Sequence, residues 1–393
     1  MTMFVPTPAD PSSTMIGQVR LAVRGLRKVF ADDPRPALEM LRRGAGKAEV
    51  LRRLNVNVGV VEASFDIRAG EIFVIMGLSG SGKSTILRLL NRLIEPSDGE
   101  IRLDGRDLTS LSRSDLVEVL RRDMSMVFQS FALLPNRTAL ENAAFGLEVA
   151  GVKRGERRET ALAALGRVGL ADYADRYPNE LSGGMQQRVG LARALAKNPT
   201  IMLMDEAFSA LDPLIRSDMQ GELLRLQRED ARTIVFISHD AEEAMRIADR
   251  IAVMEDGRIA QIGTPAEIML APADEYVRAF FRGVDASRLL RARDLARPPD
   301  DGNAGEPGRF RYRTDDAGHF RGVLAGDGAS ALFGLDPVPA DTPLQALFGR
   351  VAAATCPLPV VEADGRFIGV ISRATLLAAL DRGQAVEREV RHG

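Results

Sequence analysis

The sequence holds little of what marks several classes of protein. One cysteine among 393 residues, Cys356, excludes an internal disulfide and leaves no Cys/His cluster for a metal. No apolar run reaches the length of about 18 residues that a membrane-spanning helix needs, and the first residues do not resemble a secretory signal. The 52 basic and 54 acidic residues nearly cancel, so no broad positive field is present to hold nucleic acid. We therefore expect a cytoplasmic protein that does not bind nucleic acid and that reaches a membrane only through a partner.

The residues that are present predict an α/β protein of two or three domains. Short apolar runs alternate with segments of helical periodicity over residues 17–283, which favours a mainly parallel sheet flanked by helices. Residues 1–16 are polar and contain proline, which predicts a disordered tail. Residues 284–308 include RPPDDGNAGEPG, which is typical of a linker.

A glycine-rich loop follows the apolar segment EIFVIM and precedes the helical segment TILRLLNRL. This is the strand, loop and helix context in which the G-x-x-x-x-G-K-[ST] pattern forms a phosphate cradle. The backbone N–H groups would bind the β- and γ-phosphates, Lys83 would add a positive charge, and the Ser84 hydroxyl would ligate Mg²⁺. The alternative is an ordinary glycine-rich turn, which this context disfavours. The candidate nucleotide-binding residues of the loop are Gly77, Ser79, Gly80, Ser81, Gly82, Lys83, Ser84 and Thr85.

Polar residues at the ends of other predicted strands complete the candidate site. Asp205 and Glu206 end the apolar segment IMLM, and we expect Asp205 to hold Mg²⁺ and Glu206 to act as the general base for an attacking water. His239 directly follows the strand TIVFIS and would orient that water or Glu206. The Gln129 amide, in MSMVFQSFALLP, would reach Mg²⁺ or the water; a solvated loop glutamine is an equal alternative.

A second glycine pair opens the helical segment LSGGMQQRVGLARAL. A helix start with bare N–H groups favours an anion, yet the chain already has one phosphate cradle. The order of the motifs resembles that of the ATP-binding-cassette ATPases. That resemblance implies a helical subdomain at about 130–195 and a homodimer. The segment Leu181-Ser182-Gly183-Gly184, which is called the signature in that family, would close over the ATP of the other subunit. The residues that the resemblance adds to the nucleotide site are Ser182, Gly183, Gly184 and Asp212.

Longer segments resemble the ATPase subunit of glycine betaine/proline importers. They include MVFQSFALLPNRTALENAAFG, LMDEAFSALDPLIRSDMQ and FFRGVD. The resemblance implies a peripheral protein on the cytoplasmic face of the inner membrane, bound to permease subunits that receive solute from an external binding protein. The alternatives are a soluble cassette ATPase without a transport role, and an importer subunit for another quaternary amine or an amino acid.

An aromatic residue near the start of the domain is a candidate for binding the adenine. Relatives in the cassette family often carry one after a pattern like GLRKVF, which nominates Phe30 for stacking worth about 1–3 kcal/mol; a buried strand phenylalanine is the alternative. After Phe30, an extra segment containing PALEMLRRGAGKAEVLRRLN interrupts the usual spacing. It is either an amphipathic element that contacts lipid or the permease, or a solvated charged face.

The C-terminal region contains a short internal repeat. DAGHFRGV and ADGRFIGV place Gly318 and Gly365, and likewise Phe320 and Phe367, at the same spacing. Residues 309–393 resemble a CBS-type regulatory module with an abbreviated first copy. Thr375 stands where nucleotide-binding relatives commonly have an acidic residue, so we predict regulation by salt and leave nucleotide binding by the module open.

Overall fold

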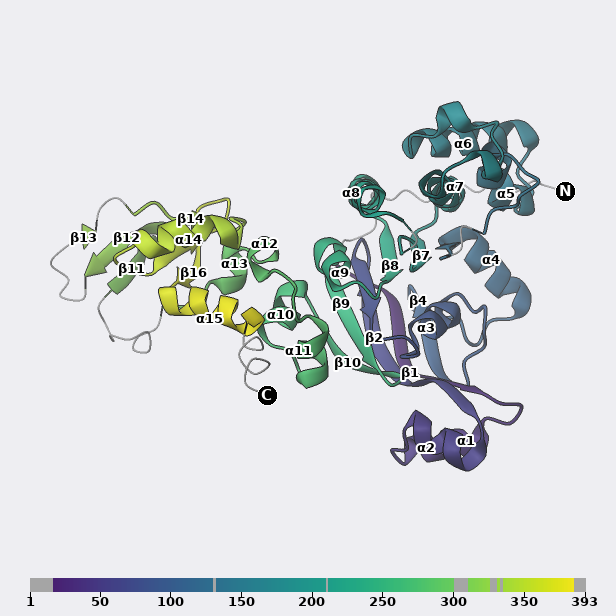
Figure 1. The fold of residues 1–393 in the computed structure, drawn as a ribbon, viewed down its shortest axis with the longest axis horizontal. Coiled ribbons are helices and arrows are strands. Elements are labelled where there is room, and N and C mark those ends of the chain that lie inside the picture. Colours follow the sequence, from purple (N-terminus) through teal and green to yellow (C-terminus); the bar gives the residue numbers. More distant parts are fainter. Residues whose placement is uncertain are drawn as a thin grey trace. The chain divides into compact units, whose positions relative to one another are not determined.

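The structure is a computed structural model that describes residues 17–129, 132–209, 211–299, 310–325, 331–332 and 335–384. The chain divides into two compact units, one ending at Thr264 and the other beginning at Pro265 (Figure 1). The predicted tail at 1–16 and most of the second half of the predicted linker lie outside the described residues. In the described part of the chain, no helix combines the length and the apolar character needed to cross a bilayer.

The first unit is built on a ten-stranded sheet in the order β5-β4-β1-β2-β10-β9-β3-β8-β7-β6. Strands β9, β3, β8, β7 and β6 run parallel, whereas β1, β2, β4 and β5 form an antiparallel extension. The strands are β1 Val19–Phe30, β2 Asn57–Arg68, β3 Ile72–Met76, β4 Asp98–Leu103, β5 Arg106–Asp107, β6 Met124–Val127, β7 Ile201–Asp205, β8 Thr233–Ile237, β9 Arg250–Glu255 and β10 Arg258–Gly263.

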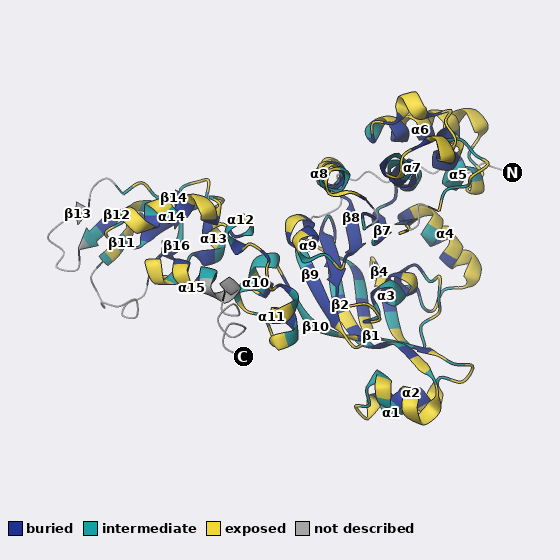
Figure 2. Ribbon diagram, in the orientation of Figure 1, coloured by how far each residue is buried: buried dark blue, intermediate teal, exposed yellow. Residues whose placement is uncertain are grey.

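The parallel half places the phosphate loop at the carboxyl edge of the sheet. Every residue of β3, β7 and β8 is buried, as expected for strands that are covered on both faces (Figure 2). The helices of this unit are α1 Arg35–Arg42, α2 Lys47–Leu54, α3 Lys83–Leu90, α4 Arg113–Asp123, α5 Ala139–Val149, α6 Arg154–Arg167, α7 Gly183–Ala196, α8 Pro213–Asp230 and α9 Ala241–Ile247. Two 3₁₀ turns, Ala171–Tyr173 and Pro178–Glu180, lie between α6 and α7.

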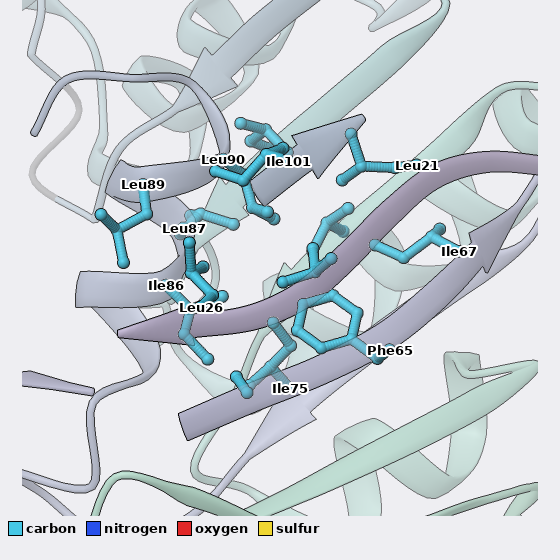
Figure 3. Packing of buried hydrophobic residues seen from close by; sticks show 14 of the residues in the cluster. Leu21, Leu26, Phe65, Ile67, Ile75, Ile86, Leu87, Leu89, Leu90 and Ile101 are labelled. Carbon is cyan, nitrogen blue, oxygen red and sulfur yellow. The ribbon is translucent and has the colours of Figure 1, made fainter. Parts of the chain in front are cut away.

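Helix α3 is fixed on the sheet by an apolar cluster that it shares with β1, β2, β3 and β4. Figure 3 shows these side chains converging from the helix and the strands. Ile86, Leu87 and Leu89 of α3 are fully buried in this cluster, and each such side chain contributes roughly 1.5–3 kcal/mol to folding. The helix that follows the phosphate loop is therefore held rigidly.

Local signals in the sequence explain where other helices begin. The Thr138 side chain accepts the N–H of Glu141, whose carboxylate in turn accepts the N–H of Thr138, so α5 starts with a capping box. Helix α8 starts at Pro213 after the cap residue Asp212. Helices α5, α6 and α7 lie within the region predicted as a helical subdomain, of which residues 130 and 131 are outside the described residues.

The second unit contains two small sheets and six helices among its described residues. Strands β11, β12 and β13 form one sheet, and β14, β15 and β16 form the other. The strands are β11 Phe310–Thr314, β12 Phe320–Ala325, β13 Ala331–Leu332, β14 Val338–Pro339, β15 Leu358–Val361 and β16 Phe367–Ile371. The helices are α10 Pro265–Leu270, α11 Glu275–Phe280, α12 Ala286–Leu289, α13 Ala292–Leu295, α14 Leu344–Ala353 and α15 Arg373–Gln384.

The boundary of this unit differs from the one predicted at residue 283. The expected linker contains α12 and α13, and Leu290, Ala292 and Leu295 are buried in one apolar cluster with α14, β15 and α15. Met269 and Leu270 of α10 pack against the same cluster. Proline and glycine mark only the later part of the segment, so composition placed the start of the second unit too late.

The internal repeat forms two hairpins that bond reciprocally. Phe320 donates its N–H to the carbonyl oxygen of Gly365 at 3.1 Å, and Phe367 donates to that of Gly318 at 3.0 Å. The two phenylalanine rings stack with centroids 6.0 Å apart. Gly318 and Gly365 have matching φ values of 83° and 86°, which favour glycine. The repeat in sequence is therefore a pseudo-two-fold pair in structure.

Candidate nucleotide-binding site

A cavity of about 350 Å³ lies at the start of α3, beside the ends of β7 and β8. Residues from four separate parts of the first unit line it, and all but one belong to the sequence-predicted site. The lining residues are Gly59, Ser79, Gly80, Gly82, Lys83, Ser84, Thr85, Glu206 and His239. The fold therefore brings the predicted phosphate loop, the predicted base and the predicted histidine to one cavity.

The conformation of the phosphate loop requires glycine. Gly82 has a φ of 110°, and a Cβ at this position would lie only 2.5 Å from the carbonyl oxygen of Gly59. As the residue before α3, Gly82 offers no side chain to cap the first turn. The first N–H groups of α3 and the positive end of its dipole are thus presented at the cavity, an arrangement suited to an anion.

Lys83 occupies the loop from within. Its side chain is buried, and its Nζ donates to the carbonyl oxygens of Gly77 at 2.8 Å and Leu78 at 3.0 Å. Burial lowers the pKa of Lys83, an effect that the nearby carboxylates of Glu206 and Asp205 oppose. The lysine thus satisfies its charge with loop carbonyls in this structure, and a bound phosphate would compete for the same Nζ.

The hydroxyl of Ser84 and the carboxylate of Asp205 face each other at the end of β7. Ser84 Oγ donates to Asp205 Oδ1 at 2.9 Å. Burial raises the pKa of Asp205, while this hydrogen bond lowers it. Two adjacent oxygen donors of this kind suit Mg²⁺, which usually takes one or two protein oxygens and completes its shell with phosphate and water. Ser84 and Asp205 therefore fit the predicted metal role, and a cluster of three or more ligands is absent from the described residues.

Glu206 contacts two other side chains of the predicted site, Gln129 and His239. Gln129 Nε2 donates to its Oε2 at 3.0 Å, and His239 Nδ1 lies 3.5 Å from the same oxygen. Glu206 has a left-handed φ of 44°, which is rare for a residue with a side chain. Its N–H donates to the carbonyl oxygen of Ile237 at 3.2 Å, so β8 fixes the turn. This places the carboxylate in the cavity beside the exposed His239 ring.

The signature residues and Asp212 lie apart from the cavity of their own chain. Ser182 is exposed and caps α7, where its Oγ accepts the N–H of Met185 at 3.3 Å. A Cβ on Gly184 would lie 2.7 Å from the Ile215 side chain, so α7 closely approaches α8 here. Among the described residues, Ser182, Gly183, Gly184 and Asp212 do not line the cavity. One chain therefore assembles only part of the predicted nucleotide site.

Phe30 stands at the rim of the site, at the end of β1. Its ring is half exposed, and a Cβ on Gly59 would lie 2.8 Å from both the Phe30 ring and the Thr85 side chain. Phe30 is thus next to two lining residues, as an adenine-stacking role requires. Gly59 was not predicted from the sequence, although a lone glycine within a strand often marks a close backbone approach.

The arrangement is that of a P-loop nucleoside triphosphatase, and comparisons with known proteins place it more narrowly. Residues 60–209 match the ABC transporter family. The glycine betaine/proline betaine transport system ATP-binding protein ProV of Escherichia coli (strain K12) is 50% identical over 93% of this chain and 98% of its own length. The glycine betaine/carnitine transport ATP-binding protein GbuA of Listeria monocytogenes serotype 1/2a (strain 10403S) is 46% identical over 92% of this chain and 97% of its own length.

A solved structure gives the same result for the fold. The dimeric structure of MJ0796, a bacterial ABC transporter cassette, aligns with a TM-score of 0.53 and 32% identity over 62% of this chain and 98% of that one. The chain belongs to the ATP-binding subunits of ABC transporters. The predicted fold class, an ABC-type P-loop domain followed by a smaller α/β region, is confirmed.

Proposed function

We propose that this chain hydrolyses ATP to power the uptake of glycine betaine, proline and related compatible solutes. The observation that carries the proposal is the extent of the similarity. Proteins named for glycine betaine transport match 92–93% of the chain, including the second unit. That match accompanies a cavity lined by the phosphate loop, Glu206 and His239, with Asp205 bonded to the lining residue Ser84.

The proposed chemistry follows from the contacts in the cavity. The N–H groups at the start of α3 and the Lys83 ammonium bind the phosphates. Ser84 and Asp205 would hold Mg²⁺, which would neutralise phosphate charge. The Gln129 amide, which donates to Glu206 in this structure, would reach the ion or the water. Glu206 accepts a proton from the attacking water, and His239 beside its Oε2 orients that water or the carboxylate.

The proposed active unit is a homodimer with two shared sites. Ser182 and Gly184 do not line the cavity of their own chain. Ser182 is exposed at the start of α7, whereas Gly184 is buried against Ile215 of α8. In a head-to-tail pair, this helix start faces the γ-phosphate of the partner's ATP and adds a charge-assisted contact that hydrolysis removes. ATP thus closes the dimer and its hydrolysis releases it.

The proposed partners are integral permease subunits and, through them, an external or periplasmic substrate-binding protein. The chain is then a peripheral protein on the cytoplasmic face of the inner membrane. The second unit, with its paired hairpins, is proposed as a CBS-type module that makes uptake depend on salt through charge contacts, screened over about 8–10 Å at ordinary ionic strength.

Reconstitution tests this function directly. The chain, its permease and its binding protein are placed in liposomes, and ATP-dependent uptake of glycine betaine, proline, choline and carnitine is measured against salt. We expect uptake of betaine-type solutes that rises with salt. ATP hydrolysis that no solute stimulates would contradict the importer function, and uptake restricted to an unrelated amino acid would contradict the proposed substrate class.

The same system tests the regulatory role with a truncation. The truncated chain ends after Thr264, at the boundary between the two units. A chain that ended at residue 309 would instead leave Leu290 and Leu295 of the apolar cluster exposed. An unchanged salt dependence of uptake in the chain that ends at Thr264 would contradict regulation by the second unit.

A further inference from the structure

The segment between β1 and β2 is a structured insertion seated beside the nucleotide cavity. Residues 31–56, which we call the insertion, contain α1 and α2. Leu38 and Leu41 of α1 and Val50 of α2 are buried against Val58 of β2 and neighbouring residues of β1 and β2 in a separate apolar cluster. The insertion is therefore fixed to the sheet by its own core.

Both ends of the insertion adjoin the cavity. It leaves β1 directly after Phe30, the predicted adenine-stacking residue, and rejoins β2 shortly before Gly59, which lines the cavity. The Phe30 ring lies against Gly59. Any rearrangement of the insertion would thus act on residues at the cavity.

One side chain of the insertion also reaches the phosphate loop. Lys47, at the start of α2, donates from its Nζ to the carbonyl oxygens of Gly80 at 2.9 Å and Ser81 at 3.4 Å. Its stem lies over Gly257, where a Cβ would come within 2.5 Å of the Lys47 Cε. The charge of Asp256, in the same turn as Gly257, favours the ammonium form of Lys47 and opposes the desolvation that lowers its pKa. The lysine is thus held between the β9–β10 turn and the loop.

The carbonyl groups that Lys47 contacts belong to peptides whose N–H groups lie in the phosphate loop. The C=O and N–H of a trans peptide point in opposite directions. The carbonyl of Gly80 shares a peptide with the N–H of Ser81, and the carbonyl of Ser81 shares one with the N–H of Gly82. The N–H of Ser81 donates to the carbonyl oxygen of Leu78 at 3.1 Å, so at the first peptide the Lys47 cation polarises a hydrogen bond inside the loop. At the second peptide it lies on the side opposite to the N–H of Gly82, the group that begins α3. Lys47 contacts carbonyls of the loop, as Lys83 does, but it comes from outside the loop.

We propose that Lys47 is a positioning residue of the nucleotide site, which holds the Gly80 and Ser81 peptides of the loop in place, keeps the Gly82 N–H directed to phosphate, and thereby couples the insertion to nucleotide binding. The inference rests on the proposed role of the loop as the phosphate cradle. Lys83 exchanges its carbonyl partners for phosphate when nucleotide binds, whereas Lys47 keeps its partners in both states. Its contribution is preorganisation of the cradle rather than direct contact with the ligand.

The test compares Lys47→Met, Lys47→Arg and Arg52→Met in the full-length chain. Methionine keeps the stem but removes the donor, arginine keeps a charged donor, and Arg52 is an exposed cation on the same helix. The readouts are the dissociation constant of ADP by titration calorimetry, KM and kcat for ATP, and the melting temperature without nucleotide. We expect Lys47→Met to weaken ADP binding and raise KM by roughly fivefold, the effect of one lost hydrogen bond of ordinary strength, with kcat changing less.

Rescue separates a positioning role from simple packing. We expect Lys47→Arg to bind ADP nearly as tightly as the natural chain, and Arg52→Met to be indistinguishable from it. The inference is overturned if Lys47→Met binds ADP normally, or if Lys47→Arg is as weak as Lys47→Met. A Lys83→Ala chain that still bound ADP normally would instead contradict the cradle itself, which distinguishes failure of the proposed function from failure of this inference.

Discussion

The phosphate loop and the signature loop both open a helix with glycine, yet they are built differently. At α3 the cap residue is Gly82, and the helix start lines the cavity. At α7 the cap residue is Ser182, whose own hydroxyl accepts a backbone N–H on an exposed surface. The first helix start lines the cavity of its own chain, whereas the second does not. This difference agrees with the proposed dimer, in which each chain would contribute different halves to two ATP sites.

The largest effect is expected from a substitution that stops hydrolysis without disturbing either helix start. Glu206→Gln keeps the shape and the contact with Gln129 but removes the proton acceptor, so we expect kcat to fall by about 10²–10⁴. ATP binding should persist, and ATP should trap a dimer that size-exclusion chromatography detects. Glu242→Gln, at an exposed position of α9, serves as the control. A Glu206→Gln chain that hydrolyses normally as a monomer would refute the mechanism.

Mixing two inactive variants tests whether the halves belong to different chains. Lys83→Ala disables the cradle, and Ser182→Arg blocks the signature helix start. Each variant alone should lose most of its ATPase activity. A mixture should regain activity, because one site of the mixed dimer combines the intact Lys83 of one chain with the intact Ser182 of the other. Circular dichroism verifies folding, since loss of the Ser182 cap costs about 0.5–2 kcal/mol. An active Ser182→Arg chain, or no recovery on mixing, would show that the two halves are not shared.

A third experiment tests the predicted adenine-binding residue Phe30, beside the phosphate loop. Phe30→Ala should weaken ATP and ADP binding by about 1–3 kcal/mol, the value of one aromatic stack on a base. Phe30→Trp should preserve the affinity, since tryptophan presents a larger ring to the base. Titration calorimetry with each nucleotide measures the change. Equal affinities for the natural chain and Phe30→Ala would leave this phenylalanine with only a structural role.

The smallest expected effect is a pH dependence of nucleotide affinity, which arises from Lys83 in the phosphate loop and from Asp205. Burial lowers the pKa of Lys83, and bound phosphate favours its charged form, so binding takes up a proton and affinity should fall as pH rises through the lowered pKa. Burial raises the pKa of Asp205, so the Mg²⁺ contribution should fall as pH drops through that value. On the alkaline limb of the profile, set by Lys83, and on the acid limb, set by Asp205, the affinity changes by about tenfold per pH unit at most.

The control for this pH profile comes from the other helix start. Ser182 does not titrate in this range, so Ser182→Ala should keep both limbs in calorimetric titrations of ADP with and without Mg²⁺. Asp205→Asn should lose the acid limb alone. Identical profiles in the natural chain and in Asp205→Asn would contradict the assignment of Asp205 to the metal.

The positions of the cavity residues were largely predictable from sequence because these residues follow buried strands. An apolar run fixes where each strand ends, and the ends of neighbouring parallel strands meet at one edge. Asp205, Glu206 and His239 were therefore placed correctly near the phosphate loop. Gly59 escaped prediction because its importance lies in contacts with Phe30 and Gly82 that are distant in sequence.

The parts of the fold that depend on tertiary contacts were less predictable. The antiparallel strands β1, β2 and β4 add a second half to the sheet that no local pattern specified. The start of the second unit was misplaced because α12 and α13 are short, and their burial depends on α14 and α15 far along the chain. The contact of Lys47 with the loop likewise joins residues whose proximity no motif announces.

The reciprocal hairpins of the second unit constrain how it can respond to its surroundings. Each hairpin supplies the acceptor for the other's amide, so a slip of either one would break both bonds at once. We expect the amide hydrogens of Phe320 and Phe367 to exchange with solvent synchronously. A change that strains one hairpin is therefore expected to strain the other, so the two hairpins should move together rather than independently.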